Sequence, residues 1–343
     1  MEVDVSTPSR SQRVEALWFE DGNIVIQAGN SQYRVYRGVL AARSPVFQDM
    51  LSFPQPPESE LVDGCPVVRL PDNEGEVTSF LSAIFGSSSF LPHPAPTHYD
   101  TVVGVLRLSH KYGVDYLHRR ALIHLSSAHR TTLSEYDKSS SYDDESKSNR
   151  PASEICSWKT SNDWAFLMVT IQLAREIDAL WILPYAFYCL AVAYPRNLNQ
   201  GIFHGAIYNG VAISISTQDQ QSFARGHSDQ CVSCAVDIVR FLFHPVDISG
   251  CTTSEKCLSA RLHAIDRHRK AVRDYPSIPL DIWDENDWQS LDGLCPACLI
   301  VLKQTHQDAR QAFWDKLPKI YGLPPWEELE KLKAATIGDN LFC

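Results

Sequence analysis

A polar, serine-rich segment at residues 137–153 divides this 343-residue chain into two parts. Because the segment has almost no aliphatic side chains, burial cannot offset the entropy of ordering it, and we expect a disordered linker. The chain as a whole is 44% hydrophobic, so each flanking part can form a core of its own. We therefore predict a flexible tail at residues 1–16, a first domain at 17–130 and a second domain at 163–335.

The first part carries the patterns of both strands and helices. Apolar residues alternate in segments 24–28 and 33–36, and the turn residues between them predict a β-hairpin. Residues 66–70 form a further strand candidate, and residues 99–112 a helix candidate. The helical spacing i, i+3, i+4, i+7, i+8 is met by Val77, Phe80, Leu81, Ile84 and Phe85. Strands and helices together predict an α+β fold.

Two segments of this part resemble signatures of the BTB/POZ domain family. Residues 36–47 read YRGVLAARSPVF and are similar to the family's His-Arg/Lys-x-x-Leu-x-x-x-Ser-x-x-Phe, with Tyr36 in place of the usual His. Residues 106–117 read LRLSHKYGVDYL and are similar to its Leu-x-x-Ala-x-Lys-Tyr-x-Val-x-x-Leu, with Ser109 in place of Ala. The order of strands and helices also agrees, so residues 17–130 are identified as a BTB/POZ domain.

The resemblance implies a function in protein binding. BTB/POZ domains pair with themselves, or present a surface to a cullin scaffold or a transcriptional cofactor, so we expect protein partners, among them a homodimer or a cullin. Asp21 and Arg37 match positions that form a charged pocket near the dimer interface in many members of the family. The alternative is an ordinary surface pair, worth less than about 1 kcal/mol.

The second part has an almost wholly helical pattern, which predicts a mainly α-helical domain after the BTB/POZ fold. Residues 313–318 and 321–329 resemble the ending of a group of uncharacterised BTB proteins that also carry paired cysteines. The apolar stretch 179–195 predicts a buried helical hairpin, because it is shorter than the roughly 20 residues of a membrane-spanning helix. The basic stretch 261–273 predicts a solvated helix face.

Three close cysteine pairs also lie in the second part: Cys231 and Cys234, Cys251 and Cys257, and Cys295 and Cys298. Two such pairs can place four thiolates about 2.3 Å from one Zn²⁺. We favour a structural zinc site made of Cys251, Cys257, Cys295 and Cys298. The first of these pairs reads as a loop free to wrap around a metal, whereas the 231–234 pair lies in an apolar helical run, where buried thiols are common.

Two alternatives to zinc remain for these cysteines. All six can be unligated thiols in the core or on the surface. Cys295 and Cys298 also form a Cys-x-x-Cys motif, which in other proteins carries redox chemistry, but the βαβ context of such motifs does not precede it.

Other sequence features disfavour catalysis, nucleic-acid binding and membranes. There is no His-Glu-x-x-His element, nucleophile elbow, Walker loop or dinucleotide fingerprint, so we predict no enzyme activity and no cofactor besides zinc. The net charge of −10 opposes binding to phosphate backbones and anionic membranes. Residues 1–12 lack the apolar core of a signal peptide, so we expect a cytoplasmic or nuclear protein, or one found in both.

The sequence therefore predicts a protein-interaction protein that uses its BTB/POZ domain for self-association or partner recruitment. One alternative is a substrate adaptor of a cullin-type ubiquitin ligase, for which the helices after residue 163 supply an extension. Another is a transcription regulator that binds DNA through the zinc region, although no helix with base-reading spacing is visible. A metalloenzyme is a third, disfavoured by the missing motifs.

Overall fold

The computed structural model describes residues 11–53, 60–140, 164–193 and 198–338. Their internal contacts divide them into an N-terminal unit, which ends at Ala128, and a C-terminal unit, from His129 to Gly338. Each unit contains its own set of fully buried apolar side chains. The two units are therefore separate cores along one chain.

The N-terminal unit is built on a five-stranded sheet with the order β1-β3-β2-β5-β4. Its strands are β1 (Gln12–Trp18), β2 (Ile24–Ala28), β3 (Ser31–Val35), β4 (Leu61–Val62) and β5 (Cys65–Leu70). Strands β2 and β3 form the predicted antiparallel hairpin, and Gly29 lies in its turn at a φ of 53°. The predicted strand at 66–70 is also present, and β5 pairs in parallel with β2.

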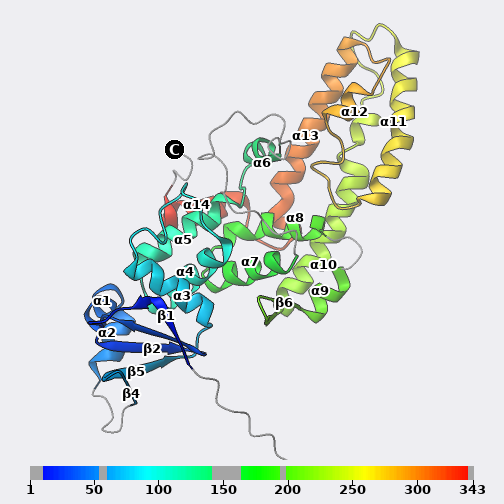
Figure 1. Ribbon diagram of the computed structural model, residues 1–343. Helices are drawn as coiled ribbons and strands as arrows, with labels where there is room; N and C mark the ends of the chain where they lie inside the picture. The colour runs from blue at the N-terminus through cyan, green and yellow to red at the C-terminus, as the bar shows by residue number, and fades with distance from the viewer. Residues whose placement is uncertain (1–10, 54–59, 141–163, 194–197, 339–343) are drawn as a thin grey trace, which may run out of the picture. The chain divides into compact units, whose positions relative to one another are not determined.

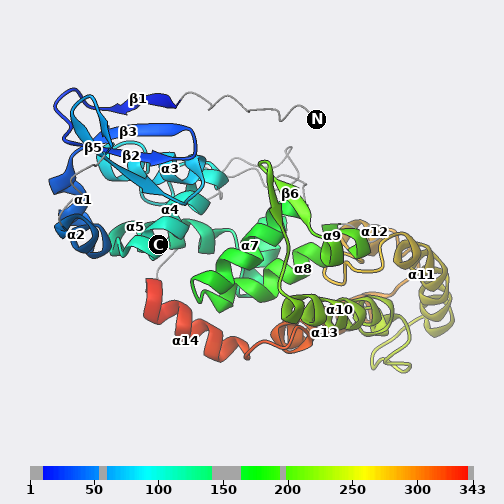
Figure 2. The ribbon, with the colours of Figure 1, turned by 90° about the horizontal axis from the view of Figure 1, so that it is seen from below.

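Five helices accompany this sheet (Figure 2). They are α1 (Arg37–Arg43), α2 (Pro45–Ser52), α3 (Glu74–Phe85), α4 (Tyr99–Tyr112) and α5 (Asp115–Ser127). Their ends follow local chemistry: the Ser44 hydroxyl accepts the Phe47 N–H at the start of α2, and the Asn73 side chain accepts two N–H groups at the start of α3. The predicted α+β fold is confirmed.

Residues from the two signature segments meet in the core of this unit. The Phe47 ring stacks on Tyr112 at 4.6 Å between ring centroids, and Phe80 stacks on the same tyrosine at 5.8 Å. The Ser44 hydroxyl donates a hydrogen bond to the Tyr112 carbonyl. The signatures therefore mark the residues that hold α2, α3 and α4 together.

The predicted flexible tail at residues 1–16 is wrong for residues 12–16, which belong to β1. This strand pairs in parallel with β3, and its Arg13 guanidinium lies 4.3 Å from the centroid of the Trp18 ring. Most of its side chains are exposed, so the strand lacks the alternating apolar pattern that would reveal it in the sequence. Pairing with β3 stabilises residues 12–16 in an extended conformation instead.

The C-terminal unit is mainly helical, as predicted, and Figure 1 shows α12 between α11 and α13. The helices are α6 (Leu133–Ser140), α7 (Trp164–Glu176), α8 (Leu183–Ala193), α9 (Leu198–His204), α10 (Thr217–Val232), α11 (Ser254–Asp274), α12 (Glu285–Gln289), α13 (Pro296–Ile320) and α14 (Trp326–Ile337). A small hairpin joins β6 (Ala206–Tyr208) to β7 (Val211–Ile213).

The apolar stretch at 179–195 is buried, but it is not a hairpin in itself. A 3-10 turn at Leu180–Ile182 leads directly into α8, and α8 packs against α7. The helix pair is thus formed by α7 and α8. None of the helices in the described segments is both long enough and apolar enough to cross a bilayer.

The predicted linker at 137–153 is wrong at its start, because residues 137–140 lie in α6. Arg310 on α13 forms an ion pair with Asp137 at 2.5 Å, and the Tyr136 hydroxyl donates to Asp281. These partners lie more than 140 residues away along the chain, so the composition of the segment cannot reveal them. Residues 141–153 lie outside the described residues.

Candidate functional site

Two helix N-termini bring four cysteines together in the C-terminal unit. Cys251 precedes α11, and Cys257 lies in the first turn of that helix. Cys295 is the N-cap residue of α13, Pro296 takes the first helical position, and Cys298 follows one turn later. Both pairs therefore consist of one cysteine before a helix and one inside its first turn.

The four sulfurs lie at distances that suit one tetrahedral metal ion. All four Sγ atoms are within 4.8 Å of one another. The Cys251 Sγ lies 3.8 Å from the Cys257 Sγ and 3.9 Å from the Cys295 Sγ. A tetrahedron with metal–sulfur bonds of about 2.3 Å has edges of about 3.8 Å. The cysteines favoured by the sequence thus form a cluster that could hold a metal.

Backbone N–H groups at the helix starts stabilise negative charge on Cys251 and Cys295, whereas burial is the main cause that raises the pKa of the Cys298 thiol. The N–H of Cys295 donates to the Cys257 Sγ at 3.3 Å. The N–H of Cys298, and then that of Thr252, lower the pKa of Cys295 to about 6. The N–H of Thr253 is the main cause of the lowered pKa of Cys251. Helix N-termini favour thiolates for the same electrostatic reason.

The remaining pair, Cys231 and Cys234, lies apart from this cluster. The Cys231 Sγ is 3.7 Å from the Nε2 atom of His227, and the Cys234 Sγ donates to the Tyr275 carbonyl at 3.7 Å. Burial raises the pKa of both thiols, that of Cys234 to about 12, so both stay protonated near neutral pH. Within the described ranges, no second group of three or more potential metal ligands is found.

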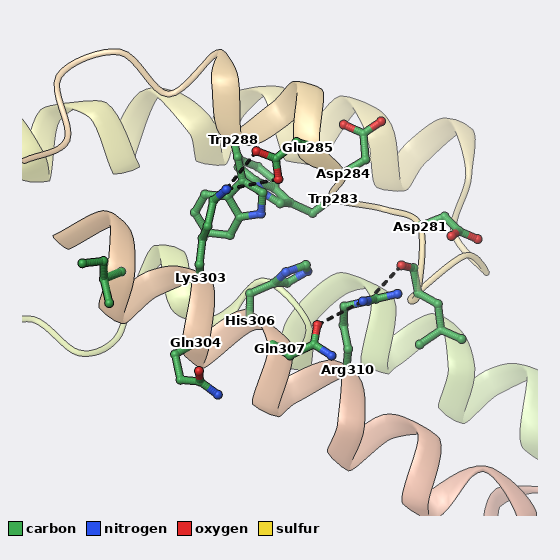
Figure 3. Close-up of a pocket in the computed structure, with 12 residues that line it drawn as sticks. Asp281, Trp283, Asp284, Glu285, Trp288, Lys303, Gln304, His306, Gln307 and Arg310 are labelled. Carbon is green, nitrogen blue, oxygen red and sulfur yellow. Dashed lines mark hydrogen bonds and ion pairs between the residues drawn. The ribbon is translucent and has the colours of Figure 1, made fainter. Parts of the chain in front are cut away.

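A pocket of about 620 Å³ lies between α12 and α13 (Figure 3). Lys303 on α13 pairs there with Glu285 on α12 at 2.9 Å. The buried Trp283 Nε1 and His306 Nε2 atoms have no hydrogen-bond partner among the residues that the structure describes. Burial, with a smaller effect of Arg310, lowers the pKa of His306 to about 3, so the imidazole is neutral. Sequence patterns do not indicate this pocket, because its lining comes from two separate segments.

Asp21 and Arg37, the predicted charged pair, bind other partners. The Tyr36 hydroxyl donates to Asp21 at 2.6 Å, and the Arg37 guanidinium donates to the Leu51 carbonyl. No ion pair between Asp21 and Arg37 is found in the N-terminal residues that the structure describes. Tyr36, which replaces the usual histidine of the signature, thus forms a hydrogen bond with the Asp21 carboxylate. The role of the pair at an interface stays a prediction.

Comparison with protein families identifies the N-terminal unit. Residues 19–129 match the family model of the BTB/POZ domain. These residues therefore form a BTB/POZ domain, which is a protein-interaction module and not an enzyme family. Neither the search of curated proteins nor the search of solved structures returned a match. The resemblance of the C-terminal ending to other BTB proteins stays a prediction.

Proposed function

We propose that this protein acts through protein–protein contacts of its BTB/POZ domain, by self-association or by recruiting a partner, and that it has no enzymatic activity. The family match over residues 19–129 is the observation that carries this proposal. In the cell we place the protein in the cytoplasm, the nucleus or both. The helical C-terminal unit then binds a second protein. The contacts of the BTB/POZ domain bring that protein into one assembly with the BTB/POZ partner.

Among the specific roles, a cullin-type substrate adaptor is supported by the combination of a BTB/POZ domain with a helical unit. A DNA-binding transcription regulator has less support, because a net charge of −10 repels phosphate backbones.

Two differently tagged full-length copies, expressed together, separate these roles. Purification through one tag is scored for the second copy, for a cullin N-terminal domain added in trans, and for a duplex DNA of random sequence. Retention of the second copy indicates self-association, retention of the cullin indicates an adaptor, and retention of DNA indicates the transcription regulator. DNA retained in the absence of any protein partner contradicts the proposal.

We further propose that Cys251, Cys257, Cys295 and Cys298 bind one structural Zn²⁺. The proposal is supported by four sulfurs within 4.8 Å of one another and by sulfur–sulfur distances of 3.8 and 3.9 Å. Four thiolate ligands leave no open position for a substrate, so such an ion holds structure and does not catalyse. It would fasten the start of α11 to the start of α13.

Metal analysis of full-length protein, purified without added metal, tests the zinc site. We expect one zinc per chain, lost in Cys298→Ser and kept in Cys231→Ser, the matched control from the other pair. Chelation should unfold the C-terminal unit and leave the N-terminal unit folded, because Cys65 is the one cysteine among residues 1–128. Metal-free protein with an intact C-terminal unit would refute the site, and zinc loss in Cys231→Ser would show that another pair binds it.

A further inference from the structure

Arg261 on α11 carries a buried guanidinium group. Arg261 is only 3% exposed, although it begins the basic stretch at residues 261–273. Within the described part of the chain, no carboxylate lies within ion-pair distance of its guanidinium. Burial of a charge is expensive unless an opposite charge compensates it, so a counter-charge is to be expected nearby.

Neutral carbonyl groups satisfy the guanidinium but do not neutralise it. Its Nε donates to the Leu242 carbonyl at 3.0 Å, and its two Nη atoms donate to the carbonyls of Phe241 and Pro245 at 3.1 and 2.9 Å. These bonds fix the position of the cation beside α11 and compensate for lost hydration.

The cysteine cluster would supply this counter-charge once its thiols are ionised. Arg261 follows Cys257 by one helical turn, so both side chains lie on the buried face of α11. Burial lowers the pKa of Arg261, and thiolates at Cys298 and Cys257 would act against that shift. Four neutral thiols would supply no such charge. Four thiolates around one Zn²⁺ carry a net charge of about −2.

We propose that Arg261 is the cation that neutralises the zinc–thiolate centre and thereby strengthens zinc binding. This inference rests on the zinc site proposed above. The buried cation and the dianionic centre each stabilise the other in the interior, since opposite charges interact more strongly there than in water. Arg261 acts as a positioning residue, because it binds no metal itself.

The same residue connects the centre to the aromatic wall of the pocket. Phe241, whose carbonyl Arg261 binds, has its ring centroid 5.1 Å from Trp283, 4.8 Å from Trp288 and 5.2 Å from His306. Figure 3 shows these last three side chains lining the pocket. Zinc removal should therefore alter the fluorescence of the two tryptophans as well as the packing of α11.

The test measures the zinc dissociation constant of the full-length protein by competition with a chromophoric chelator. Arg261→Gln keeps amide donors for the carbonyls but removes the charge, and Arg261→Lys keeps the charge but removes the planar fork. Outer-shell partners change metal affinity by about 10- to 100-fold, and we expect a loss of that size for Arg261→Gln and a smaller loss for Arg261→Lys. Arg269→Gln, which removes an exposed charge from the same helix, should leave the constant unchanged.

Equal losses of zinc affinity in Arg261→Gln and Arg261→Lys would overturn the proposal. The hydrogen bonds of the guanidinium, and not its charge, would then determine the zinc affinity. Wild-type affinity in Arg261→Gln would overturn it as well. Should Arg261→Gln fail to fold, Arg261→Lys decides alone: affinity close to wild type supports the charge, and loss as large as that of Cys298→Ser overturns it. A wild-type protein that binds no zinc contradicts the zinc site itself, which is a distinguishable failure.

Discussion

Replacement of Phe80 by alanine tests whether the buried face of α3 is the core of the BTB/POZ domain. The Phe80 ring is 0% exposed and stacks on Tyr112, which also stacks on Phe47. A phenylalanine-to-alanine change at a fully buried site removes the transfer free energy of the ring and leaves a cavity, which together cost about 3–5 kcal/mol. Since a domain is stable by only about 5–15 kcal/mol, this loss should be easy to detect.

Urea unfolding of the full-length protein, followed by circular dichroism, measures the free energy of unfolding of each unit. We expect Phe80→Ala to shift the transition of the N-terminal unit and to leave that of the C-terminal unit in place. Phe53→Ala is the matched control, because Phe53 is 70% exposed and its loss should cost less than about 0.5 kcal/mol. A cost below about 1 kcal/mol for Phe80→Ala would refute the assignment of this face to the core.

Three further predictions concern the C-terminal unit and residues 141–153. His306 is buried and neutral with a pKa of about 3, so the unfolded state binds a proton more readily as the pH falls below about 6.5. The C-terminal unit should therefore lose up to about 1.4 kcal/mol per pH unit between pH 6.5 and 3, and His306→Phe should reduce this slope whereas the exposed His263→Phe should not. Arg310→Met breaks the ion pair with Asp137 and the bond to the Leu280 carbonyl, so it should destabilise the unit by about 1–3 kcal/mol in urea, and a neutral effect would contradict the anchoring of α6. Limited proteolysis should first cut within residues 141–153, as their serine-rich sequence predicts. First cuts within α6 would contradict both the linker and the anchoring of α6.

The N-terminal fold could be predicted because its signals are local. The hairpin at 24–35, the helix that carries Phe80 and the two signature segments each show their pattern within a dozen or so residues. The strand β1 gave no such signal, since its order comes from pairing with β3 and most of its side chains are exposed. The hairpin of β6 and β7 did carry a signal, because Asn209 and Gly210 form a turn with positive φ at both positions, typical of a two-residue hairpin.

The cysteine cluster was predicted from local context. The buried residues of α11 that follow it along the chain were not predicted. The loop before α11 and the Cys-x-x-Cys at the start of α13 indicated which cysteines can converge, although 38 residues separate Cys257 from Cys295. The interpretation of 261–273 as a solvated face is wrong for Arg261 and His268, which are 3% and 6% exposed. Both lie on the face of α11 that also carries Cys257 and Ala264, so helical spacing contained the signal, and the charge of the stretch obscured it.

The central claim, that the BTB/POZ domain binds protein partners, is tested most directly by deletion. Full-length protein and a chain lacking residues 19–129 are purified side by side from the same cells under native conditions, and every stoichiometric copurifying protein is quantified, with a second copy of the chain included. We predict at least one partner that binds the full chain and is lost on deletion, while zinc remains bound to both. A chain that retains no protein at all, or the same set of proteins with and without the domain, would contradict the account.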